Sequence, residues 1–65
     1  MSKEIDRKVY GIGERGEVVM ITFKDNVVEG SVTHTERYVV RMGAFTMQET
    51  AGKGDAERTA KALVN

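Results

Sequence analysis

The sequence predicts a small α+β fold: an antiparallel β-meander of three to five strands, with one C-terminal α-helix packed on one face of the sheet. Residues 17–23, read EVVMITF, are the most apolar and most β-branched run, as expected for a central strand. Residues 55–64 carry apolar side chains at helical spacing instead. With 65 residues in total, we expect residues 1–65 to form a single domain.

The strands are expected in chain order. Residues 1–8 are polar and form a frayed tail or an edge strand, and the meander occupies residues 9–50. Lys24, Asp25 and Asn26 are predicted to turn the chain after the central strand, and residues 34–36 to turn it again. Between and after these turns we expect strands over residues 27–35, 37–42 and 45–50, with Gly43 at a bulge or turn.

The helix is predicted over residues 55–64, with Asp55 as its N-cap. Its apolar stripe consists of Ala56, Ala60, Leu63 and Val64. A helix of ten residues is marginal alone in water, so this stripe must dock on the sheet, with Leu63 as the main anchor.

Strand alternation divides the apolar residues between two sheet faces. We expect the helix to cover the face that carries Val19, Ile21, Val28, Val32, Tyr38 and Val40. The other face would then present a partner-binding surface formed by Val18, Met20, Arg37, Val39 and Arg41. Apolar residues mixed with arginine are typical of protein interfaces, so this surface is expected to bind a protein partner or a second copy in a homodimer.

No catalytic, metal-binding or cofactor-binding site is expected. The chain has no cysteine and one histidine, His34, and Ser31 would point to the opposite face of the same strand. Residues 11–16 match the dinucleotide-binding pattern G-x-G-x-x-G, but the run that follows them predicts a strand where that motif requires a helix. We therefore interpret these residues as a glycine-rich hairpin turn.

The charges balance, with ten Lys and Arg against ten Asp and Glu. This balance does not favour nucleic acid, whose binding requires a basic surface. The alternative function is nevertheless a nucleic-acid-binding module that uses Arg37, Arg41, Lys53 and Arg58. No apolar run approaches the roughly 20 residues of a membrane span, and the first residues are charged, so we expect a cytoplasmic protein without membrane contact.

Residues 49–63, read ETAGKGDAERTAKAL, resemble the glycine-rich turn and alanine-rich final helix of the double-stranded-RNA-binding fold. The resemblance extends over residues 38–64 and implies a sheet-plus-helix shape, although Asp55 and Glu57 stand where that family places lysines. A second resemblance, to Sm- and SH3-type barrels, rests on their strand-turn-strand spacing. It is carried by Gly16, Val18, Asp25, Asn26, Gly30, Val32 and Tyr38.

In size and composition the chain also resembles small accessory proteins of phages and mobile elements, including anti-CRISPR inhibitors. Together these features predict a non-enzymatic protein that acts through protein–protein interaction, such as a phage-encoded inhibitor of a host system.

Overall fold

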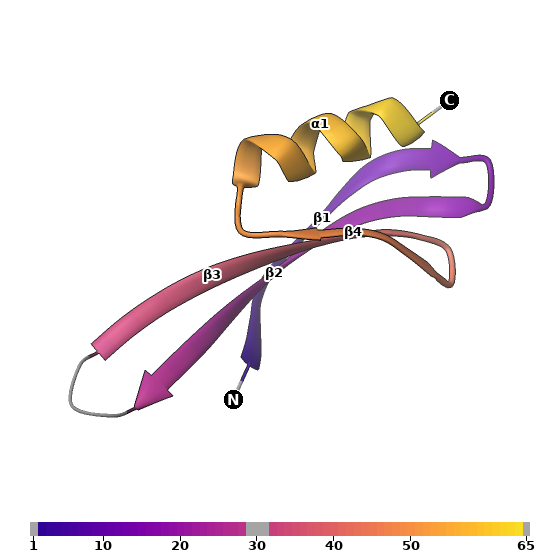
Figure 1. Ribbon diagram of the computed structural model, residues 1–65. Coiled ribbons are helices and arrows are strands. Elements are labelled where there is room, and N and C mark those ends of the chain that lie inside the picture. The colour runs from indigo at the N-terminus through magenta and orange to yellow at the C-terminus, as the bar shows by residue number, and fades with distance from the viewer. Residues whose placement is uncertain (1, 29–31, 65) are drawn as a thin grey trace.

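The computed structural model describes residues 2–28 and 32–64, and the side chains of residues 3–24 and 36–64. In chain order it contains β1 (Ser2–Gly13), β2 (Gly16–Val28), β3 (Val32–Met42), β4 (Phe45–Thr50) and α1 (Lys53–Leu63). The four strands form one antiparallel sheet in the order β1-β2-β3-β4, and α1 crosses one face of it (Figure 1). The predicted α+β meander with a C-terminal helix is confirmed.

The predicted turn at Lys24, Asp25 and Asn26 is wrong, because these residues lie within β2 and pair with Glu36, Thr35 and His34 of β3. The predicted turn over residues 34–36 is wrong for the same reason. Turn propensity is a weak local preference, and continuous pairing between two long strands overrides it. The connection between the strands runs through residues 29–31, which lie outside the described residues, as do the side chains of Val28 and Val32.

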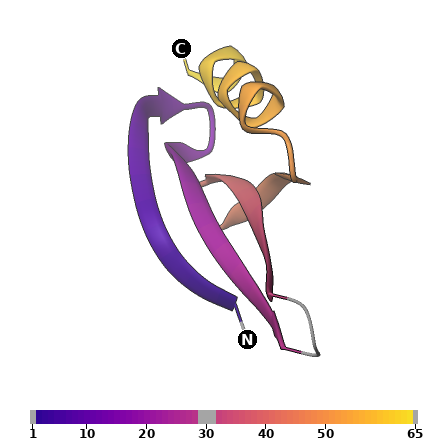
Figure 2. The ribbon, with the colours of Figure 1, turned by 90° about the vertical axis from the view of Figure 1, so that its left-hand side faces the viewer.

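The first eight residues belong to the sheet from Ser2 onward, so they form an edge strand (Figure 2). The glycine-rich segment is a tight turn, with β1 ending at Gly13 and β2 starting at Gly16. This turn packs against the β3–β4 turn, where Gly43 adopts φ +59° and its N–H donates to the Glu17 carbonyl at 3.0 Å. A Cβ at Gly43 would lie 2.3 Å from the Arg15 carbonyl oxygen, so only glycine fits there.

The core lies between α1 and the sheet face that it crosses. It is formed by the buried side chains of Val18, Met20, Tyr38, Val40, Met42, Ala56 and Ala60, with Tyr10, Leu63 and Val64 packed at its edge. The two fully buried alanines let α1 approach the strands closely, whereas Leu63, the expected main anchor, is only partly buried.

The prediction of which β2 residues face the helix is wrong by one residue. Tyr38 and Val40 do lie under α1, but Val18 and Met20 join them there, and Val19 and Ile21 lie on the opposite face. A one-residue shift exchanges every side chain between the two faces of a sheet. Because residues 18–21 are all apolar, their alternation does not indicate which set meets the helix.

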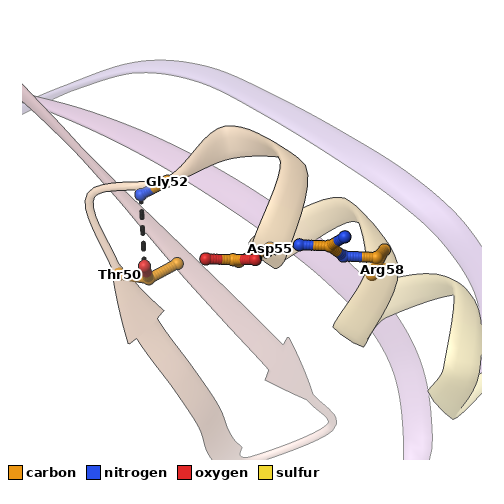
Figure 3. A network of polar contacts seen from close by, with 4 residues as sticks. All are labelled: Thr50, Gly52, Asp55 and Arg58. Carbon is orange, nitrogen blue, oxygen red and sulfur yellow. Dashed lines mark hydrogen bonds and ion pairs between the residues drawn. The ribbon is translucent and has the colours of Figure 1, made fainter.

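The helix begins at Lys53, two residues earlier than predicted, and Gly52 rather than Asp55 is its N-cap. The Gly52 N–H donates to Thr50 Oγ1 at 3.1 Å, which fixes the tight connection from β4 (Figure 3). Asp55 lies in the first turn, where its carboxylate complements the helix dipole and pairs with Arg58. At the other end Val64 leaves the helix and forms a β-bridge with Gly13, tying the end of α1 to the end of β1.

Candidate docking surface

The sheet face opposite α1, called here the helix-free face, is built from rows of directly paired residues that run across the strands. One row is Arg7, Ile21, Val39 and Glu49, and the next is Val9, Val19, Arg41 and Thr46. Further rows hold Glu4, Phe23 and Arg37 at one end and Ile12 with Glu17 at the other. Paired residues share a face, so these side chains project to the same side of the sheet.

The centre of the helix-free face is an apolar floor formed by Val19, Ile21 and Val39. These side chains are only 8%, 4% and 8% exposed, although no second layer of secondary structure in the described chain covers them. Their directly paired neighbours include Arg7 and Arg41. The long aliphatic stem of an arginine can cover neighbouring apolar surface while its guanidinium group stays in water.

An open pocket of about 310 Å³ lies above this floor. Its walls are formed by Arg7, Glu17, Val19, Ile21, Arg41 and Gly43. The two arginines stand on opposite sides of β2, on β1 and β3. The pocket thus combines an apolar base with guanidinium and carboxylate groups at its rim, and it opens to solvent.

Ion pairs connect the charged groups of the helix-free face. Arg7 Nη2 donates to Glu4 Oε1 at 2.9 Å, and this hydrogen bond is the main cause that raises the pKa of Arg7 above its ordinary value. Arg37 pairs with Glu49 and stacks over the Phe23 ring, 5.2 Å from its centroid. Solvent-exposed ion pairs of this kind stabilise a fold only weakly, because water screens them.

Exposed aliphatic side chains extend the apolar floor toward the sheet edge at β1. Val9 is 54% exposed beside Val19, and Ile12 is 64% exposed beside Glu17. They are the most exposed apolar side chains in the paired rows of the helix-free face. A partner that covers Val9 and Ile12 would gain binding free energy by removing their apolar surface from water.

The expected partner-binding residues divide between two locations. Arg37, Val39 and Arg41 lie on the helix-free face, as predicted, but Val18 and Met20 are buried under α1 and are not accessible from it. Sequence reasoning missed the contributions of Arg7, Val9, Val19, Ile21 and Glu49 to this surface. Val19 and Ile21 have no local signal in the sequence, because residues 18–21 are all apolar, and the β2–β3 register, in which Met20 pairs with Val40, decides which side chains share a face.

The four cations of the expected nucleic-acid contact are not brought together. Arg37 and Arg41 are on the helix-free face, whereas Lys53 and Arg58 belong to α1 on the other side of the sheet. Arg37 and Arg58 are each paired with a carboxylate, of Glu49 and Asp55 respectively.

Catalytic and metal-binding residues can be assessed only within the described part of the chain. The side chains of Ser31 and His34 lie outside it. Within it, no cluster of three or more histidine, aspartate or glutamate residues could hold a metal ion. None of its helices has the length and apolar character needed to cross a membrane.

Comparisons of the chain with known protein families, with curated proteins and with solved structures found no match. The candidate docking surface is therefore supported by the geometry of this structure alone.

Proposed function

We propose that this protein acts as a non-enzymatic binding protein that docks on a protein partner through its helix-free face. One observation carries the proposal. The helix covers a single face of the sheet, and the opposite face combines an apolar centre with a rim of arginine and glutamate side chains. Protein interfaces have this organisation, with a desolvated apolar centre, a polar rim and an enrichment in arginine.

The arrangement of charge favours protein over nucleic acid as the partner. Phosphate-driven binding needs an excess of positive charge on one surface. On the helix-free face the described arginines are matched by glutamates, and Lys53 and Arg58 lie on the other side of the molecule. Duplex DNA or RNA is accordingly expected to bind weakly.

The biological role in this proposal is inhibition of the partner by occupation of its surface. The small size of the chain and its resemblance to phage-encoded inhibitors of host systems, anti-CRISPR proteins among them, support this part. A small protein of this kind needs only a contact surface on its partner and no catalytic site.

Site-specific photo-crosslinking in the producing cell tests the proposal. A photoreactive phenylalanine derivative at Val9, on the helix-free face, should give covalent adducts with protein. The same group at Ala62, exposed on α1, is the matched control and should give few adducts. Adducts from position 62 alone, or adducts with nucleic acid from position 9, would contradict the proposal.

A salt series with duplex DNA and duplex RNA separates the two functions directly. A phosphate-driven complex weakens by orders of magnitude between about 50 mM and 200 mM salt. We expect no such complex, and specific binding with that salt dependence would establish the nucleic-acid module instead.

A further inference from the structure

We infer that the occupant of the helix-free face is a second copy of this chain, so that two sheets stack face to face with the two helices on the outside. This inference rests on the proposed function, because it concerns the same surface. It names a second copy as the protein that docks there, so inhibition of any other protein would be carried by the outer surfaces of the dimer. A two-fold arrangement presents the same patch from both copies, so the patch must be complementary to itself.

The charges of the helix-free face meet that condition. Three arginines and three glutamates project from it among the described residues: Arg7, Arg37, Arg41, Glu4, Glu17 and Glu49. The chain as a whole is also neutral, with ten basic and ten acidic residues. Two identical surfaces can therefore approach without net repulsion. The face has no excess charge that would favour a strongly acidic or a strongly basic partner.

The apolar part of the face is placed for the same arrangement. Val19, Ile21 and Val39 form the floor, and the exposed Val9 and Ile12 stand next to it on β1. In the stacked dimer, the second sheet would cover this floor. A sheet with one apolar face packed on a helix and the other packed on a second sheet is a stable layered architecture.

The extents of the molecule set an upper limit on the area of the surface. The molecule measures 45 × 20 × 15 Å along its principal axes. The broad side thus has a projected area of about 900 Å² as an upper limit, comparable with the ~800 Å² per partner of a standard protein interface.

Association through the outer edge of β1 is one competing arrangement, and the structure disfavours it. The register of β1 is interrupted twice, between Glu4 and Asp6 and between Val9 and Gly11. Bulges and charged side chains such as Lys3 and Lys8 are features that protect an edge strand from pairing with another chain.

Sedimentation equilibrium of the purified protein tests the inference, over concentrations from about 10 μM to about 1 mM. The wild-type protein, with a chain mass of 7.2 kDa, should reach twice that mass. Val9→Glu and Ile12→Glu each place a carboxylate at the contact and should weaken the dimer by roughly tenfold or more. Ala62→Glu, on the exposed side of α1, should dimerise like the wild type.

Circular dichroism shows whether each variant is folded. If one of the two substitutions, at Val9 or at Ile12, disturbs β1, the other variant still provides the test. A wild-type protein that stays monomeric at the highest concentration overturns the inference. Dimers that persist in both folded helix-free-face variants overturn it as well.

The result also separates this inference from the proposed function. A monomeric wild-type protein that still crosslinks to another protein from position 9 would reject the second copy and retain the docking surface. A dimer that is lost in Val9→Glu supports the second copy as the protein that docks on this face.

Discussion

Met20 shows what a single side chain contributes to the core. It is 2% exposed beneath α1, and the Tyr10 hydroxyl lies 4.0 Å from its sulfur. We predict that Met20→Glu unfolds the protein, because an unpaired carboxylate there would lose its hydration without gaining a partner. Val9→Glu, at a 54% exposed position, should remain folded.

Thermal unfolding followed by circular dichroism checks this pair of variants. A folded Met20→Glu protein, with a melting curve like that of the wild type, would mean that Met20 does not lie under the helix.

The only two tyrosines, Tyr10 and Tyr38, report on the folded state at high pH. The Tyr38 hydroxyl donates to the Glu36 carboxylate at 2.5 Å, and this hydrogen bond, followed by burial, raises the pKa of Tyr38. Burial, followed by the nearby Glu57, raises the pKa of Tyr10. Both phenols should therefore titrate above their ordinary pKa of about 10 in the folded protein.

A raised pKa in the folded state adds stability that is fully present below the unfolded pKa, near 10, and is lost as pH rises through the folded value. We predict that the free energy of unfolding decreases above about pH 10. This decrease should be smaller in Tyr38→Phe, which removes one of the two groups. Ultraviolet absorbance of tyrosinate measures the titration, and transitions at or below the ordinary pKa would contradict the assigned contacts.

At the scale of elements, the two turns at one end of the sheet depend on each other. Gly43 of the β3–β4 turn needs a positive φ and lies against Arg15 of the β1–β2 turn, whereas a Cβ at Gly54 in α1 would touch nothing within 4 Å. We predict that Gly43→Ala lowers the free energy of unfolding by about 2 kcal/mol or more. Gly54→Ala should raise it by roughly 0.5–1 kcal/mol, because alanine loses less backbone entropy in a helix.

Chemical denaturation of both variants against the wild type provides the measurement. Equal midpoints for Gly43→Ala and the wild type would show that the two turns do not pack as described.

Elements that have a local sequence pattern could be predicted, whereas the extent of a strand that depends on pairing with another strand could not. The stripe of Ala56, Ala60 and Leu63 indicated a docked helix, because helical spacing is visible in a single segment. The glycines between residues 11 and 16 likewise indicated the first turn. The length of β2 was not predictable from Lys24, Asp25 and Asn26, since pairing with β3 decides whether such residues turn or extend.

At the scale of the whole molecule, the fold class was predictable and the composition of the docking surface was only partly so. Arg37, Val39 and Arg41 were placed correctly because the alternate set on β3, Tyr38, Val40 and Met42, is entirely large and apolar and was therefore assigned to the helix side. Val19 and Ile21 were assigned to the wrong face because β2 is apolar on both sides. The pairing of Arg7 with Glu4 depends on the bulge between Glu4 and Asp6, which the sequence pattern does not reveal.

The molecule has one sheet face covered by α1 and one open face, on which we propose that a second copy docks. Isotope-filtered nuclear Overhauser spectroscopy on a mixture of labelled and unlabelled protein measures contacts between copies directly. We predict intermolecular signals at the methyl groups of Val9, Val19, Ile21 and Val39, and none at Val18 or Val40 beneath the helix. An absence of intermolecular signals at millimolar concentration, or signals confined to methyl groups of α1 such as Ala62, would contradict the account.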